Sequence, residues 1–248
     1  MSGIHFLDAK GPDGVHLFAI GDVHGRLDLL QAMHRRIAER IAEAQLPDWR
    51  IIHLGDYVDR GPNAKGVLDH LIERQGEDPR FVALAGNHDV GFLDFLAMPD
   101  TRGLFANWGG DATALSYGVH ADFRDPVRLR HVHAALSRAV PGRHLRFLEA
   151  LGFSASFGDF FFCHAGIRPG VGLDAQSPDD LVWIRDKFLN HASLHPKVIV
   201  HGHTPQPEPE ILPNRINVDT LAYQSGVLTA LEIEGASKRI LTVSDRRT

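Results

Sequence analysis

The sequence has little of several features that would mark particular classes of protein. It contains a single cysteine, Cys163, which excludes an internal disulfide framework and is typical of a reducing compartment. No apolar run approaches the roughly 20 residues that a transmembrane helix needs. The first residues lack the charged-then-apolar layout of a signal peptide. We therefore expect a cytoplasmic protein that makes no membrane contact.

A basic surface is also missing. The 26 lysines and arginines are outnumbered by 31 aspartates and glutamates, which gives a net charge of −5 and argues against a nucleic-acid partner. A hydrophobic fraction of 44% and a charged fraction of 23% are ordinary for a soluble domain with a sizeable core. Tyrosines number only three, whereas histidines number sixteen. This excess matters because neutral imidazole is the commonest metal ligand in proteins.

Short apolar runs alternate with helical patterns in the first hundred residues. The runs at 15–20, 50–54 and 81–85 predict strands, and each is followed by a glycine and then by apolar residues at helical spacing. This βαβαβα order predicts an α/β fold with crossover helices. Residues 91–151 are less regular and rich in helix formers, and we interpret them as a helical insertion within a single domain spanning 1–248.

The second half of the chain returns to strand patterns. A hairpin turned at Gly158 and Asp159 is expected, and Ser177 is expected to cap a helix that begins with a proline. The proline-rich segment 204–213 is interpreted as a loop. The predicted strands of this half are 153–157, 160–163, 197–201, 227–233 and 239–244.

Polar residues recur where the predicted strands end. The motifs are GDVHG at 21–25, GDYVDRG at 55–61, GNHD at 86–89, HAG at 164–166 and HGHT at 201–204. One such motif alone is most simply a turn or a helix cap, but a solvated turn does not explain its repetition at successive strand ends. In open α/β sheets, ligands bind at the carboxyl ends of strands. We therefore expect one patch that contains Asp22, His24, Asp56, Asp59, Asn87, His88, His164, His201 and His203.

The chemistry of this patch indicates metal. Carboxylate, amide and imidazole donors suit manganese, zinc or iron. The donors are too many for one ion of four to six ligands, so the pattern predicts two divalent ions bridged by a carboxylate.

Taken together and in this order, the motifs resemble the phosphoprotein phosphatase branch of the calcineurin-like metallophosphoesterases. The likeness is to the small bacterial and phage serine/threonine protein phosphatases and runs over residues 19–219. WGGDAT at 108–113 and LVWIRD at 181–186 also resemble segments of that family. The resemblance implies a β-sandwich flanked by helices, with a βαβαβ core and a dinuclear metal site at the carboxyl ends of the strands.

The resemblance also implies a role for each matching residue. Asp22 and His24 would bind the first ion, and Asp56 would bridge both. The second ion would be held by Asn87, His164 and His203. His88 would be the general acid and Asp59 its orienting carboxylate. Phosphate would be bound by Arg60, Arg185 and Asn87.

This sequence departs from the family pattern at several positions. Ala85 stands where relatives often carry an arginine, and Asp89 replaces a longer glutamate. Pro205 stands where a second metal-binding histidine would be needed, so His203 is the expected ligand. His201 is then expected to support the site or to lie in the core.

These residues are compatible with two classes of function. One is a phosphate-ester hydrolase in which a metal-activated water attacks phosphorus in line; the other is a binding or scaffold protein on a decayed catalytic fold. Retention of every proposed ligand favours the enzyme.

For the substrate, the sequence favours a phosphorylated side chain of a protein or peptide, and the family resemblance implies serine or threonine. Ala85 and the absence of lysine and arginine from residues 91–100 leave few groups to hold a tetraphosphate. The alternative is a symmetrical diadenosine tetraphosphatase.

Overall fold

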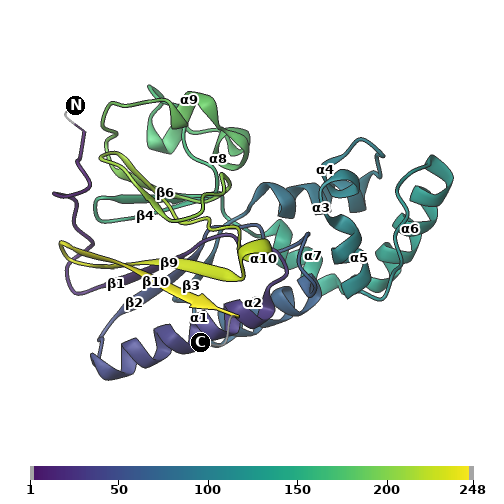
Figure 1. The fold of residues 1–248 in the computed structure, drawn as a ribbon, viewed down its shortest axis with the longest axis horizontal. Coiled ribbons are helices and arrows are strands. Elements are labelled where there is room, and N and C mark those ends of the chain that lie inside the picture. The colour runs from purple at the N-terminus through teal and green to yellow at the C-terminus, as the bar shows by residue number, and fades with distance from the viewer. Residues whose placement is uncertain (1–2, 246–248) are drawn as a thin grey trace.

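The fold is a sandwich of two β-sheets with helices on both outer faces (Figure 1). The structure is a computed structural model that describes residues 3–245. Within those residues the strands form two five-stranded sheets, in the orders β10-β9-β1-β2-β3 and β4-β5-β6-β8-β7. The α/β sandwich predicted from the sequence is confirmed.

In the first sheet, β1, β2 and β3 are parallel, and β9 runs antiparallel to both β1 and β10. Its strands are β1 (His16–Ile20), β2 (Trp49–His53), β3 (Phe81–Ala83), β9 (Val227–Glu234) and β10 (Ser237–Ser244). In the second sheet, β5, β6 and β8 are parallel, whereas β4 and β7 pair antiparallel with their neighbours. Its strands are β4 (Ser154–Phe157), β5 (Phe160–Cys163), β6 (Val198–His201), β7 (Glu210–Ile211) and β8 (Arg215–Asn217).

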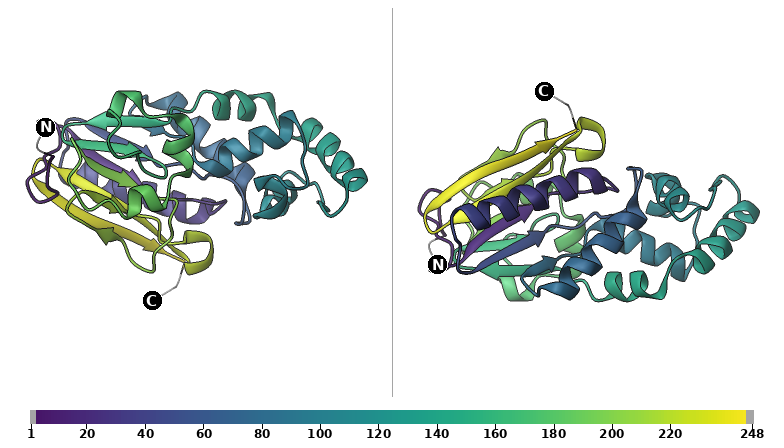
Figure 2. Two further views of the ribbon diagram at one scale, coloured as in Figure 1. Left: turned by 90° about the horizontal axis from the view of Figure 1, so that it is seen from above. Right: turned by 90° about the horizontal axis from the view of Figure 1, so that it is seen from below.

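Helices cover the outer face of each sheet and extend beyond one end of the sandwich. Helices α1 (Leu27–Glu43) and α2 (Ala64–Glu77) lie against the first sheet, and α8 (Pro178–Trp183) and α9 (Asp186–Leu189) lie against the second (Figure 1). Figure 2 shows five further helices projecting from the end at which the parallel strands finish. These are α3 (Asn87–Ala97), α4 (Leu104–Asn107), α5 (Gly110–Ser116), α6 (Pro126–Ala139) and α7 (Gly142–Glu149).

Strand alternation divides the core into layers. Successive side chains of a strand point to opposite faces, so Leu17 and Ala19 of β1 pack between the two sheets, whereas Phe18 and Ile20 pack towards α1. The layer around Phe18 continues without a break into the apolar faces of α3 to α7. We therefore propose that the helical segment belongs to the same domain as the sandwich. No helix among residues 3–245 has the length and apolar character that crossing a membrane requires.

Local sequence signals account for most of the elements. The expected hairpin is present, with β4 and β5 antiparallel around Gly158 and Asp159. Ser177 caps α8 by accepting a hydrogen bond from the backbone N–H of Asp180. The interpretation of residues 204–213 as a loop was incomplete, because β7 lies inside this segment, and β8 was not expected at all. Both strands are very short and depend on pairing within the sheet, because β8 pairs with β6 and β7 pairs with β8.

Three histidines form a relay between α1, β2 and α2, in which His34 and His53 are buried and His70 is half-buried. Nδ1 of His53 can only donate to the carbonyl oxygen of Val82, 2.9 Å away, so Nε2 of a neutral His53 is an acceptor. Nε2 of His34 lies 2.8 Å from that acceptor, and Nδ1 of His34 lies 2.9 Å from Nε2 of His70. Burial leaves an added positive charge on His34 or His53 with little water around it, and the neighbouring imidazoles offer no negative charge to balance it. Burial, together with its histidine neighbours, lowers the pKa of His34 to about 2, and burial lowers that of His53 to about 4.

This relay predicts a loss of stability in mild acid. Below the ordinary histidine pKa of about 6.5, the unfolded chain binds protons that the folded relay excludes, so the free energy of unfolding falls by about 1.4 kcal/mol per pH unit for each histidine. His34→Gln keeps a donor and an acceptor but does not titrate. The free energy of unfolding of this variant, measured with urea between pH 7.5 and 5, should therefore fall less steeply with decreasing pH than that of the wild type. The difference should equal the contribution of about one histidine. His120→Gln, at an exposed position, is the control. Equal slopes for wild type and His34→Gln would contradict the role of the relay.

Candidate metal centre

The predicted metal ligands lie together where the strands of both sheets end. Asp22 and His24 follow β1, Asp56 follows β2, and Asn87 is the first residue of α3. His164 directly follows β5 and His203 follows β6. All six side chains are buried: Asp22, His24, Asp56, Asn87, His164 and His203.

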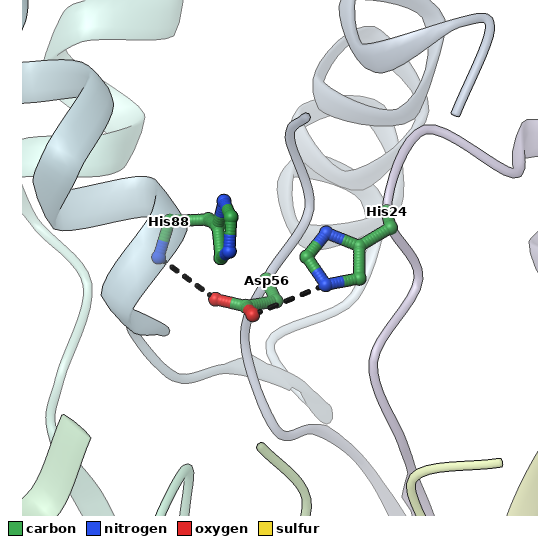
Figure 3. Close-up of side chains that lie close together, drawn as sticks. All are labelled: His24, Asp56 and His88. Atoms are coloured by element: carbon green, nitrogen blue, oxygen red, sulfur yellow. Dashed lines mark hydrogen bonds and ion pairs between the residues drawn. The ribbon is translucent and has the colours of Figure 1, made fainter. Parts of the chain in front are cut away.

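Asp56 occupies the middle of this group. Its Oδ2 lies 3.3 Å from Nε2 of His24, and its Oδ1 lies 3.5 Å from Nε2 of His164. The backbone N–H of His88 also donates to Oδ1, at 2.9 Å. Figure 3 shows the Asp56 carboxylate between His24 and His88. Two sets of potential ligand atoms share Asp56, which is the position required of a bridging ligand. One set contains His24 and His88, and the other contains Asp22 and His164.

Asn87 joins the second set. Its Oδ1 lies 2.9 Å from both Nε2 of His164 and Nδ1 of His203. The backbone N–H of His203 donates to the carboxylate of Asp22 at 3.2 Å, which ties the loop after β6 to the loop after β1. The second sheet therefore contributes two imidazoles to a centre whose carboxylates come from the first sheet.

The hydrogen bonds of the histidines show that these residues fit a metal. Nδ1 of His24 donates to the carbonyl of Val58 at 2.8 Å, and Nδ1 of His164 donates to that of Leu54 at 2.9 Å. In a neutral ring, each Nε2 then presents a lone pair to an oxygen of Asp56. Burial lowers the pKa of His24 to about 3 and also lowers that of His164, so both rings are neutral. Lone pairs that face one another call for a cation between them, and oxygen and imidazole donors suit manganese, zinc or iron.

The backbone at the centre is held in an uncommon conformation. Positive φ is infrequent for residues other than glycine and clusters at functional sites. Among the described residues, seven such positions occur and five of them belong to the predicted site: His24, Asp56, Asp59, Arg60 and His203. The N-terminus of α3 also approaches very closely, because a Cβ on Gly86 would lie only 2.2 Å from the backbone nitrogen of Asp56.

His88 and Asp59 form the predicted acid pair. Nδ1 of His88 lies 2.7 Å from Oδ2 of Asp59, and both side chains are buried. Nε2 of His88 accepts from Nη2 of Arg60 at 3.0 Å, so both ring nitrogens are occupied by protein groups and His88 is not needed as a ligand. Burial lowers the pKa of His88, but the carboxylates of Asp56 and Asp59 outweigh it, so the pKa lies above its ordinary value.

Thr113 extends this pair and was not assigned from the sequence. Its Oγ1 donates to Oδ1 of Asp59 at 2.8 Å and accepts from the backbone N–H of Asp59 at 2.7 Å. The only sequence signal was the WGGDAT segment, in which Thr113 is the final residue. Thr113 thus fixes the carboxylate that orients the imidazole of His88.

The two predicted phosphate-binding arginines reach the centre from different elements. Arg60, after β2, is half-buried and places Nη1 3.3 Å from Nε2 of His24. Arg185, between α8 and α9, is exposed and donates from Nη2 to the carbonyl oxygen of His203 at 3.3 Å. Cζ of Arg60 also lies 5.1 Å from the ring centroid of Tyr223, a residue that sequence reasoning missed. Tyr223 belongs to the four-residue helix α10 (Ala222–Ser225).

Two buried aspartates around the centre act on its ligands. Asp89 accepts hydrogen bonds from the backbone N–H groups of Asp56, Tyr57 and Gly86 at 2.8 to 2.9 Å. Although it is shorter than a glutamate, its side chain therefore holds the loop that carries Asp56. Asp219, which the sequence analysis did not assign, helps to raise the pKa of Asp22, although burial is the larger cause.

His201 is fully buried beside the ring of Phe188 and does not join the ligand group. This placement fits the expectation that His201 lies in the core or supports the site.

Comparison with known proteins places this geometry in a family. The model of the calcineurin-like phosphoesterases matches residues 15–229. A bis(5'-nucleosyl)-tetraphosphatase PrpE of Anoxybacillus flavithermus, described as asymmetrical, is 28% identical over 231 residues, which are 86% of this chain and 88% of that protein.

Two solved structures share the fold. A putative diadenosine tetraphosphatase has a TM-score of 0.66 and 18% identity over 96% of this chain and all of that one. A serine/threonine phosphatase of Saccharomyces cerevisiae has a TM-score of 0.58 and 14% identity over 98% of this chain and 86% of that one. The chain therefore belongs to the calcineurin-like phosphoesterases, the family that its strand-end motifs predicted.

Proposed function

We propose that this phosphoesterase is a metal-dependent bis(5'-nucleosyl)-tetraphosphatase. The observation that carries the proposal is the likeness to the PrpE protein, which extends over 86% of this chain and 88% of that relative. From the sequence, a phosphoprotein is the first predicted substrate, and the alternative is a symmetrical tetraphosphatase. The comparisons favour the second reading, and the relative is described as asymmetrical. We accordingly infer cleavage to a nucleoside triphosphate and a nucleoside monophosphate.

The proposed division of ligands between two ions follows the family resemblance, although the ligand atoms of Asp22 lie with those of Asp56 and His164 in this structure. Asp22, His24 and Asp56 would hold one divalent ion, and Asp56, Asn87, His164 and His203 the other. Bound divalent ions supply Lewis-acid stabilisation and a water of lowered pKa. Manganese is the first ion to test, because the donor set suits it.

The remaining chemistry rests on residues of the chain itself. Water adds to one phosphorus, the P–O bond on the opposite side breaks, and the departing oxygen takes the electron pair. Arg60 and Arg185 are placed to bind the non-bridging oxygens, which carry the charge of the transition state. A phosphate bound to Arg60 would draw the guanidinium away from Nε2 of His88, 3.0 Å distant in this structure. That nitrogen would then be free to carry a proton to the leaving group, while Asp59 holds the ring in place.

Product analysis tests the proposal. Purified protein with Mn²⁺ is incubated with diadenosine tetraphosphate, and the nucleotides are separated by chromatography. The expected products are ATP and AMP in equal amounts, and turnover should stop when the metal is removed with a chelator. ADP as the only product would show symmetrical cleavage.

A parallel assay with a phosphoserine peptide separates the main alternatives. Negligible turnover of the dinucleotide with rapid turnover of the peptide would overturn the proposal in favour of a protein phosphatase. No hydrolysis of any phosphate ester by metal-loaded protein would support the binding-protein alternative.

A further inference from the structure

A groove with an aromatic wall opens beside the proposed metal centre. It has a volume of about 330 Å³ and lies between α3, the start of α4 and Trp183 at the end of α8. Trp183 is 43% exposed and Met98 is 78% exposed, although large apolar side chains are normally buried. Two exposed apolar side chains therefore line one small groove.

The groove begins close to the reacting groups and leads away from them. The ring of Trp183 lies 6.3 Å from the ring of His203, centroid to centroid, and nearly perpendicular to it. Two residues further on, Arg185 donates to the carbonyl of the same His203. Along α3, the rise of 1.5 Å per residue places Gly91 about 5 Å beyond His88 and Met98 about 15 Å beyond it. A substrate whose phosphate reaches Arg185 could thus lay its other end in the groove.

The charge of the groove excludes phosphate as its occupant. Its lining residues include no lysine or arginine, and they include the carboxylates of Asp94 and Asp100. Nε of Arg102 lies 3.5 Å from Oδ1 of Asp100 and offsets part of that charge. The carboxylate of Asp94 repels a polyphosphate but can accept a hydrogen bond from an amino group on a ring. The exposed face of Trp183 favours a flat, uncharged partner, because aromatic side chains stack on nucleobases. The absence of lysine and arginine from residues 91–100 argues against binding of a tetraphosphate in this segment, but it suits the uncharged base of a nucleotide.

We propose that this groove binds one nucleobase of the substrate by stacking on Trp183, with Asp94 accepting from an amino group of the base. The inference rests on the proposed function, since it names the subsite that holds one nucleoside of the dinucleotide. It assigns the phosphates to Arg60 and Arg185 and the base to a groove whose lining residues include no lysine or arginine.

A pair of inhibitors isolates the contribution of the base. AMP and ribose 5-phosphate share a phosphate and a ribose, and only AMP has a base. Each is tested as an inhibitor of p-nitrophenyl phosphate hydrolysis by the metal-loaded protein. Stacking on an aromatic side chain corresponds to about 5- to 150-fold in affinity, so AMP should bind tighter than ribose 5-phosphate by a factor in that range. The ratio of the two inhibition constants is compared within each variant, which cancels any general change in activity.

Variants then assign the effect to the groove. Trp183→Ala should bring the ratio close to one, whereas Trp183→Phe, which keeps an aromatic face, should retain most of it. Leu115→Ala, at an exposed apolar position outside the groove, should leave the ratio unchanged. A wild-type ratio near one, or an undiminished ratio in Trp183→Ala, would overturn the inference.

This test is independent of the dinucleotide assay. A clear preference for AMP without cleavage of diadenosine tetraphosphate would uphold the base-binding groove and reject the proposed substrate. Cleavage of the dinucleotide with no preference for AMP would do the reverse.

Discussion

Replacement of Asp56 by asparagine is expected to remove metal and activity together. Asparagine has almost the same shape, but its side chain offers one neutral acceptor oxygen and an NH₂ group in place of two anionic oxygens. It therefore cannot bridge two cations. The loss also leaves the buried imidazoles of His24 and His164, 3.3 and 3.5 Å from the carboxylate, without their shared anion.

The expected size of this effect is large. Lewis-acid stabilisation is worth several kcal/mol, so kcat on the dinucleotide should fall by on the order of 10³-fold or more. Metal content after dialysis, measured by elemental analysis, should fall in parallel. Asp13→Asn, an exposed substitution of the same kind, should change neither quantity. An active Asp56→Asn protein that keeps two ions per chain would refute the bridging role.

Replacement of His88 by asparagine should slow the reaction while the metal stays bound. Loss of a general acid typically costs about 10²- to 10⁴-fold in rate. The amide of asparagine is a hydrogen-bond donor that can replace the imidazole N–H at Oδ2 of Asp59, while Thr113 continues to donate to Oδ1. The loss should be greatest for an alkyl phosphate, whose alkoxide leaving group needs a proton.

The loss should be smaller for two other leaving groups. A nitrophenolate departs without a proton, and a polyphosphate is already stable as an anion near neutral pH because the second pKa of a phosphate is about 6. The measurement is kcat/KM for all three substrates together with metal content. Equal losses on the three substrates, or loss of metal from His88→Asn, would show that His88 is not the acid.

Sequence reasoning located the centre because its signals are local. Each candidate ligand lies shortly after the end of a strand that the apolar pattern identifies, and parallel strands bring their carboxyl ends to one edge. Asp22 and Asp56 follow neighbouring parallel strands of one sheet, and His164 and His203 follow neighbouring parallel strands of the other. Packing of the two sheets then brings the two pairs together, as the resemblance implied.

The parts that were missed depend on contacts between distant segments. Thr113 meets Asp59 across 54 residues, and no local pattern reports such a pairing. Tyr223 belongs to a helix of only four residues, and the preceding residue, Leu221, has a positive φ. The helix propensity of so short a segment gives little information about its position. The sequence favours a phosphoprotein substrate because few basic residues follow the GNHD motif. Where the remaining basic residues lie relative to Trp183 is a property of the folded chain and cannot be read from their number.

Anomalous diffraction from crystals grown with Mn²⁺ tests the central claim most directly. The account predicts two anomalous peaks per chain, both within coordinating distance of the Asp56 carboxylate, with His24 on one ion and Asn87, His164 and His203 on the other. A single peak, or two peaks of which only one contacts Asp56, would contradict it.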